Sequence, residues 1–309
     1  MPIDRDLDIF NARVAAVVPR LAVPTPEARR ARVEATARHF AYPADDVARS
    51  NRWLVLDGRE LLVRVYRPGP GRLPAMLYLH GGGWVAGSVD THDGAAAALA
   101  RDAGIVVASV QYRRAPENPW PAPNDDGYAA LRWLADSAES LDIDASRIAV
   151  GGDSAGGHLA IGLALEARER GGPSIALQLL LYPVVEPDFE TDSYREHAVT
   201  GTLTRADMID YWRHYLPDPA SCSDMRALPA RARLHSLPPA HIVVAGMDPL
   251  RDEGVRLAQL LRAAGVAADL VEASTLTHGF LRAAPFVAAA RDAQQRFGAA
   301  VRAALHARV

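Results

Sequence analysis

The chain has 309 residues, and 49% of them are hydrophobic, which is enough for one large α/β core with a smaller subdomain. A formal net charge of −3 gives no electrostatic footprint for nucleic acid or an anionic membrane, so neither is expected as a partner. The single cysteine, Cys222, excludes an internal disulfide and a cysteine-based metal cluster.

The sequence contains no span of 18 consecutive apolar residues, and no charged segment followed by an apolar one near its start. From this pattern we expect a soluble, cytoplasmic protein. The sequence leaves a homodimer open.

The first forty residues predict two helices. An amphipathic helix is indicated by apolar residues that recur at intervals of three and four: Leu7, Phe10, Val14, Val17 and Leu21. Thr25-Pro26 then has the composition of a helix start, with a capping threonine before a proline, and the second helix is expected to reach about His39.

The next part of the chain predicts a β-hairpin followed by βαβ units. The hairpin spans 52–66, with Asp57-Gly58 at its turn. Strands and helices then alternate, as in a mostly parallel sheet. Six further strands are expected at 75–79, 105–111, 147–150, 176–182, 241–245 and 268–273. The fold expected is therefore a single α/β domain over 1–309, with eight strands flanked by helices.

Two segments lie outside this alternation and predict a helical cap. These are residues 1 to about 45 and about 186 to 220. The second belongs to a stretch of nearly sixty residues without the alternation, and an unstructured loop of that length would be unusual in a compact domain. Residues 205–216 carry an aromatic stripe, which we expect to pack on the core and roof a substrate pocket. Trp84 and Trp212 are the expected pocket residues.

The loop His80-Gly81-Gly82-Gly83-Trp84 follows the apolar run at 75–79. Three glycines let backbone N–H groups face outward without obstruction by a Cβ atom. An acyl-transfer enzyme needs such donors for its oxyanion. Gly82 and Gly83 are favoured, with the N–H of Ala155 as a third donor, and the sequence does not separate Gly81 from these.

The segment Gly152-Asp153-Ser154-Ala155-Gly156 lies between an apolar run and an Ala/Leu-rich stretch at 155–170. A strand, a turn of small residues around one serine and a helix form the layout of a nucleophile elbow. The N–H groups at the start of the helix point at the same place, where they can stabilise an anion. Ser154 is the predicted nucleophile.

Asp248 and His278 complete a predicted triad in the chain order Ser, Asp, His. Asp248 is the first acid after the apolar run at 241–245, although it could also cap the following helix, and Asp252 and Glu253 are nearby alternatives. His278 is the only histidine between Asp248 and the last helix, so it is the predicted base.

The remaining polar candidates are interpreted as structural. His158 lies one helical turn beyond Ser154 and cannot fold back onto its hydroxyl. His92 has no second histidine at ligand spacing, so a helix cap in a solvated turn is expected and a metal site is not. Asp153 and Glu117 are expected to position strand ends and loops.

Taken together, these motifs resemble those of the bacterial hormone-sensitive-lipase-like esterases of the α/β-hydrolase superfamily. The shared motifs are H-G-G-G at 80–83, G-D-S-A-G-G at 152–157, D-P-L-x-D-E-G at 248–254 and H-G-F at 278–280. The stretch 112–121 is also similar, with Arg114 in place of an apolar residue and Trp120 in place of Phe. The resemblance extends from about Pro68 onward and implies a Ser154–His278–Asp248 triad, a carboxylic-ester substrate and no cofactor.

Other functions share this fold and these motifs. In the plant gibberellin receptors the base position is altered, whereas His278 is intact here, which favours catalysis. An amidase or lactonase would use the same triad and stays open. A true lipase is disfavoured because no large apolar insertion is present, so the expected substrate is a short- to medium-chain acyl ester.

Overall fold

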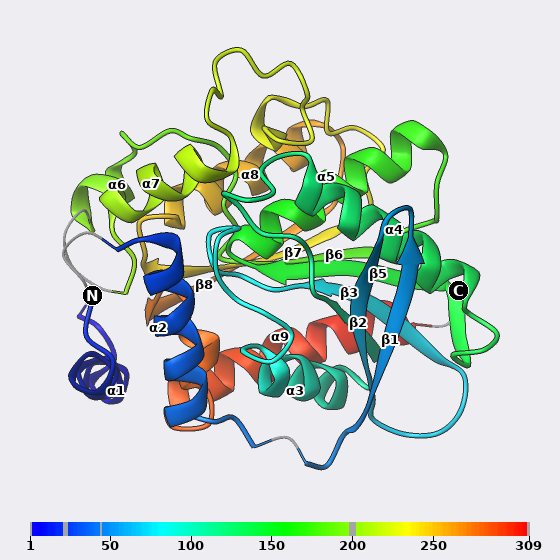
Figure 1. The fold of residues 1–309 in the computed structure, drawn as a ribbon, viewed down its shortest axis with the longest axis horizontal. Helices are drawn as coiled ribbons and strands as arrows, with labels where there is room; N and C mark the ends of the chain where they lie inside the picture. Colours follow the sequence, from blue (N-terminus) through cyan, green and yellow to red (C-terminus); the bar gives the residue numbers. More distant parts are fainter. Residues whose placement is uncertain (1, 21–23, 44, 198–201, 308–309) are drawn as a thin grey trace.

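The computed structural model describes residues 2–20, 24–43, 45–197 and 202–307. One twisted sheet of eight strands runs through it in the order β1-β2-β4-β3-β5-β6-β7-β8 (Figure 1). The strand bounds are β1 Ala48–Leu56, β2 Arg59–Arg67, β3 Leu73–Leu79, β4 Val106–Val110, β5 Ile143–Asp153, β6 Leu177–Leu181, β7 Ala240–Met247 and β8 Ala268–Thr277. The predicted α/β fold with eight strands is confirmed.

The sheet is antiparallel at one edge and parallel elsewhere. β1 and β2 form the expected hairpin around Asp57-Gly58, and β2 also pairs antiparallel with β4. The remaining neighbours are parallel, so the carboxyl ends of these strands lie side by side at the same end of the strands. β3 and β5 are direct neighbours, with Leu79 opposite Gly152. This register brings the glycine loop after β3 beside the serine turn after β5.

Helices cover both faces of the sheet, which explains why the central strands are apolar on both sides. In Figure 1, α3 and α9 lie on one face and α4, α5 and α8 on the other. The helix bounds are α1 Arg5–Val17, α2 Pro26–His39, α3 Asp93–Ala103, α4 Ala122–Asp136, α5 Ala155–Arg170, α6 Asp192–Glu196, α7 Arg205–Tyr215, η1 Pro229–Arg231, α8 Arg251–Ala263, η2 Phe280–Ala283 and α9 Ala288–His306.

The two N-terminal helices form as predicted, but the apolar stripe of the first is only partly buried. Thr25 caps α2 by accepting a hydrogen bond from the Ala28 N–H. In α1, Leu7 and Phe10 are buried, and Phe10 packs against Phe40 and Phe286, whereas Val17 at the end of the helix is 48% exposed. Leu21, the last residue of the predicted stripe, lies outside the described residues.

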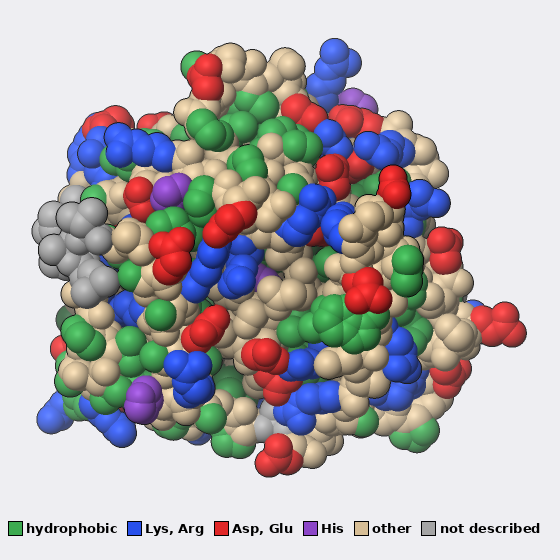
Figure 2. All heavy atoms as spheres, in the orientation of Figure 1, with side chains coloured by type: hydrophobic (Ala, Val, Ile, Leu, Met, Phe, Trp, Pro, Cys, Tyr) green, Lys and Arg blue, Asp and Glu red, His purple; other side chains and the backbone are tan. Residues whose placement is uncertain are grey.

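Surface features bear on two sequence predictions. No helix of the described residues is long and apolar enough to cross a membrane. On the face in Figure 2, basic and acidic side chains are interspersed. That face therefore has no continuous basic surface of the kind that binds nucleic acid.

Candidate active site

The serine turn has the backbone of a nucleophile elbow. Ser154 follows the last residue of β5 and precedes α5, with φ +56° and ψ −121°, a conformation that few non-glycine residues adopt. Its N–H donates to the Leu181 carbonyl at 2.8 Å, which fixes the turn to β6. A Cβ atom on Gly156 would overlap the Leu79 carbonyl, so the tight packing requires glycine there.

The side chains of Ser154, His278 and Asp248 form one hydrogen-bonded row. His278 Nε2 lies 3.0 Å from Ser154 Oγ, and His278 Nδ1 lies 2.7 Å from Asp248 Oδ2. All three residues are buried, Asp248 completely. Thr202 Oγ1 donates to the His278 carbonyl at 2.7 Å and helps to fix the loop after β8. The geometry therefore suits proton transfer from the serine hydroxyl to the imidazole.

The two neighbouring acids point elsewhere. Asp252 Oδ2 accepts from the Ser193 N–H at 2.8 Å. Glu253 accepts from the N–H groups of Val185 and Glu186 and from the Tyr194 hydroxyl, and burial raises its pKa to about 8. Asp248 is thus the carboxylate that contacts the imidazole. It also accepts from the Leu250 N–H at 2.9 Å, but it does not cap α8, whose N-cap residue is Leu250 and has no side-chain cap.

The backbone donors beside Ser154 can be separated by their acceptors. The N–H groups of Gly82, Gly83 and Ala155 have no acceptor among the residues that the structure describes. By contrast, the Gly81 N–H donates to Asp153 Oδ1 at 2.9 Å. Gly82 and Gly83 have positive φ and line the cavity in front of Ser154. This arrangement favours Gly82, Gly83 and Ala155 as oxyanion donors over Gly81.

Asp153 links the serine turn to the glycine loop. Besides the Gly81 N–H, its Oδ1 accepts from the Tyr78 hydroxyl at 2.7 Å and lies 3.6 Å from His92 Nε2. Burial alone would raise the pKa of Asp153, but His92 and the hydrogen bonds from Tyr78 and Gly81 outweigh it and hold the pKa below its ordinary value. The structural role expected for Asp153 is thus to fix the glycine loop, which carries the Gly82 and Gly83 N–H groups.

His92 is placed differently from the sequence prediction. It is buried, makes no capping hydrogen bond to α3, and its ring lies 5.4 Å from that of His80. His92 does occupy the N-cap position of α3, but the expectation of a solvated side chain was wrong, because the turn before α3 packs against Asp153 at the carboxyl end of β5. Burial, and then the charge of His92, lower the pKa of His80 to about 3. The described residues contain no group of three or more metal-ligating side chains.

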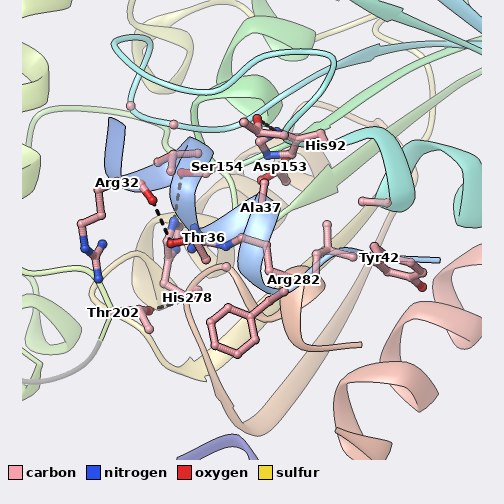
Figure 3. Close-up of a pocket in the computed structure, with 18 of the residues that line it drawn as sticks. Arg32, Thr36, Ala37, Tyr42, His92, Asp153, Ser154, Thr202, His278 and Arg282 are labelled. Carbon is pink, nitrogen blue, oxygen red and sulfur yellow. Dashed lines mark hydrogen bonds and ion pairs between the residues drawn. The ribbon is translucent and has the colours of Figure 1, made fainter. Parts of the chain in front are cut away.

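A cavity of about 250 Å³ opens directly in front of Ser154 and His278 (Figure 3). Both predicted cap segments contribute to its wall, α2 from the first and α7 with the residues before it from the second. The residues of these two segments that line it are Arg32, Val33, Thr36, Ala37, Phe40, Ala41, Tyr42, Thr202, Leu203, Met208 and Tyr211. No described residue of α1 is among them; α1 instead packs through Phe10 against Phe40 and Phe286.

The two tryptophans expected in the pocket are not part of its wall. Trp84 stacks on Tyr215 at 4.2 Å between ring centroids, Trp212 packs against both, and all three are buried. They lie behind the glycine loop, where the edge of His158 also packs against them. The prediction is corrected to Tyr211, one residue earlier on α7, whose ring lies so close to Gly83 that a Cβ there would overlap it.

Ion pairs connect the two predicted cap segments to each other and to the rest of the chain. Arg30 of α2 pairs with Glu117 in the loop before α4, which is the structural role expected for Glu117. Arg29 pairs with Asp207 and Asp210 of α7, both at 3.0 Å, and so joins the two cap segments to each other. Sequence reasoning gave no signal for these contacts, because arginines on a polar helix are usually solvated.

Comparison with known proteins agrees with the fold. Residues 76–282 match the alpha/beta hydrolase fold family. The carboxylesterase NlhH of Mycobacterium tuberculosis is 46% identical over 255 residues, which cover 80% of each chain, and the ethyl acetate hydrolase of Pseudomonas putida is 40% identical over 276 residues, which cover 86% of each. A hyperthermophilic esterase from the archaeon Pyrobaculum calidifontis has a TM-score of 0.90 at 36% identity, covering 98% of this chain and 99% of that one. This chain therefore belongs to the alpha/beta-hydrolase-fold family and, within it, to the hormone-sensitive-lipase-like esterases.

Proposed function

We propose that this protein is a serine carboxylesterase that hydrolyses short- to medium-chain acyl esters, with Ser154 as nucleophile, His278 as base and Asp248 as the acid that orients it. The observation that carries the proposal is the buried Ser154–His278–Asp248 row, with distances of 3.0 and 2.7 Å, facing a cavity. A serine activated in this way is the recurring nucleophile of acyl transfer.

The reaction begins when His278 Nε2 takes the Ser154 proton as Oγ attacks the ester carbonyl. Asp248 keeps the proton of Nδ1 directed away from the serine and stabilises the imidazolium that forms. His278 then donates its proton to the leaving alcohol, and an acyl-Ser154 ester remains. In the second half a water molecule attacks that ester while His278 takes its proton. The bond between the acyl group and Ser154 Oγ then breaks, His278 returns the proton to Oγ, and the acid is released.

The negative charge of each tetrahedral intermediate falls on the former carbonyl oxygen. The N–H groups of Gly82, Gly83 and Ala155 are free to donate to it, and each such donor contributes about 3 kcal/mol to the transition state. Because Asp153 and the tight packing around the loop fix these donors before substrate arrives, no reorganisation is needed during the reaction.

The size of the cavity supports short and medium acyl groups. Its volume of about 250 Å³ is below the range of about 300–1,000 Å³ typical of sites for drug-sized ligands. The helices α2 and α7 close it on the cap side, so a long acyl chain would have to displace them.

Hydrolysis of a p-nitrophenyl ester series from acetate to palmitate tests the proposal. We expect kcat/KM to be highest for short and medium chains, and Ser154→Ala to abolish turnover while the thermal transition is kept. A phosphonate probe should label Ser154 in the wild type and nothing in the variant. Residual activity of Ser154→Ala within about tenfold of wild type would contradict the nucleophile, since losing a triad member costs several orders of magnitude.

The alternatives differ in the bond that is broken. Matched anilides and lactones offered at the same concentrations measure amidase and lactonase turnover directly, and binding without turnover of any of these substrates would indicate a receptor.

The cytoplasmic location and the possible homodimer stay predictions. Cell fractionation tests the location, and light scattering across a range of protein concentrations tests the homodimer.

A further inference from the structure

The cavity wall contains two arginines from different elements. Arg32 comes from α2 and Arg282 from η2, four residues after His278. In Figure 3 the Arg282 side chain is directed toward Thr36, and the Arg32 side chain extends away from Ser154 on the side of Thr202. Both residues are half-buried and line the cavity wall.

Neither guanidinium is paired with an acid. Within residues 2–20, 24–43, 45–197 and 202–307, Arg32 has one hydrogen bond, from Nε to the Val18 carbonyl at 3.3 Å, and Arg282 has no side-chain hydrogen bond or ion pair. The stretches 21–23 and 198–201, which the structure does not describe, contain no Asp or Glu in the sequence. By contrast, Arg29 and Arg30, on the same helix as Arg32, are both paired with carboxylates.

The two positive charges also repel each other. Burial, and then the charge of Arg282, lower the pKa of Arg32 below its ordinary value. An arginine stays protonated even so, and two unpaired guanidinium groups within one small cavity remain attractive to an anion.

The acidic residues of the cavity do not cancel this charge. Asp90 pairs with Arg64 at 2.8 Å, and Asp93 pairs with Arg49 at 3.0 Å and with Arg64 at 3.1 Å. Asp153 lies at the glycine loop, where it accepts hydrogen bonds from Tyr78 and Gly81. Among the described residues of the cavity wall, Arg32 and Arg282 are therefore the cations without an acid partner.

We propose that the preferred substrates of this esterase carry a carboxylate besides the ester bond, and that Arg32 and Arg282 bind that carboxylate. The inference rests on the proposed function, because it concerns the substrate of the Ser154 site. Arg is suited to the role, since its planar group binds a carboxylate through two parallel hydrogen bonds. A carboxylate has a pKa of about 4, so the preferred substrates are anions at neutral pH.

The carboxylate could sit in the acyl part or in the alcohol part of the ester, and two substrate pairs distinguish these. The acyl pair is 4-nitrophenyl hydrogen glutarate and its neutral counterpart, 4-nitrophenyl methyl glutarate. The alcohol pair is acetoxyacetate and the neutral acetoxyacetamide, followed by acid release at constant pH. For each pair the measured quantity is the ratio of kcat/KM for the anionic ester to that for the neutral one, after subtraction of spontaneous hydrolysis.

We expect the wild-type ratio to exceed one in at least one pair, and to fall when NaCl is raised, because salt screens the attraction. Arg32→Gln and Arg282→Gln should each lower that ratio about tenfold, the factor produced by about 1.4 kcal/mol of lost interaction. Arg282→Lys should restore part of the ratio because it keeps the charge. The matched control is Arg38→Gln, because Arg38 lies on α2 but is exposed and outside the cavity wall.

The possible results separate the two proposals. If the wild type hydrolyses neither member of any pair, the proposed function itself fails. If it hydrolyses the neutral esters but shows a ratio of one or less in both pairs, the substrate inference is overturned. A ratio above one that Arg32→Gln and Arg282→Gln leave unchanged overturns it as well, because the preference would then come from elsewhere in the cavity.

Discussion

Replacing Asp248 by asparagine tests how the imidazole of His278 is oriented. In the wild type, Asp248 Oδ2 lies 2.7 Å from His278 Nδ1 and its Oδ1 accepts from the Leu250 N–H. An asparagine would keep the bond to Leu250 through its oxygen and direct its NH₂ group at His278. Nδ1 would then act as the acceptor, so the ring proton would move to Nε2, which faces Ser154 Oγ at 3.0 Å. A protonated Nε2 cannot take the serine proton.

The expected loss follows from this change of tautomer. Asp→Asn at the orienting position of a serine triad lowers kcat about 10⁴-fold, which corresponds to about 5.5 kcal/mol of transition-state stabilisation. Asp252→Asn is the matched control, because Asp252 is four residues further on and binds the Ser193 N–H instead of His278. We expect it to change kcat less than about threefold, since it loses only part of a half-exposed contact.

The assay measures kcat and kcat/KM for p-nitrophenyl acetate, with thermal unfolding recorded for each variant to exclude loss of the fold. The result that would refute the reasoning is a larger loss for Asp252→Asn than for Asp248→Asn. A loss of less than about tenfold in Asp248→Asn would also refute it, because the imidazole would then be oriented by another group.

Three further predictions concern the surroundings of the triad. Tyr211→Ala removes the ring packed over Gly83 and should shift the preferred acyl length toward longer chains, whereas Tyr211→Phe should not. An identical chain-length profile in the wild type and both variants would exclude Tyr211 from the acyl site. Asp153→Asn weakens the hydrogen bond from the Gly81 N–H. It should lower kcat about tenfold, the effect of losing about one charge-assisted hydrogen bond, and should change KM less. A change in KM alone would argue against a positioning role. His158 is buried next to the tryptophan pair, and burial lowers its pKa to about 4. The unfolded chain binds a proton at this imidazole near pH 6.5 and the folded chain does not, so the unfolding free energy falls as the pH is lowered. Between about pH 7.5 and about pH 5, His158→Gln should make this fall about 2 kcal/mol smaller than in the wild type, as measured by urea denaturation. An equal fall in both proteins would contradict the prediction.

The part of the site that follows from the sequence lies at the carboxyl ends of the parallel strands. Ser154, Asp248 and His278 each come directly after a strand, and a strand with its following turn can be recognised from local composition. Because neighbouring parallel strands end at the same edge, three such positions meet even though they are far apart in the chain. Gly82 and Gly83 also follow a recognisable strand, but the pairing of β3 with β5, which lays them beside Ser154, is known only from the structure.

The pocket wall could not be predicted in this way, because it depends on how whole helices dock. On α7, consecutive residues point about 100° apart, so Tyr211 faces the cavity while Trp212 faces the core. The sequence shows an aromatic stripe on this helix but not which edge of it meets the core. Likewise nothing local distinguishes Arg32, which is unpaired in the cavity, from Arg29, whose partners lie some 180 positions away in the chain.

This division has a consequence for how the enzyme distinguishes substrates. The proposed catalytic groups are attached to the sheet, through the Leu79–Gly152 register and the hydrogen bonds of Asp153. The part of the cavity wall proposed to contact the rest of the substrate comes largely from α2 and α7, which are held by ion pairs and side-chain packing rather than by strand pairing. A substitution in the cap can therefore change which ester is bound while the donors and the triad stay in position. On this reasoning, cap variants change the ratios of kcat/KM between esters, and variants of the strand ends lower the turnover of every ester alike.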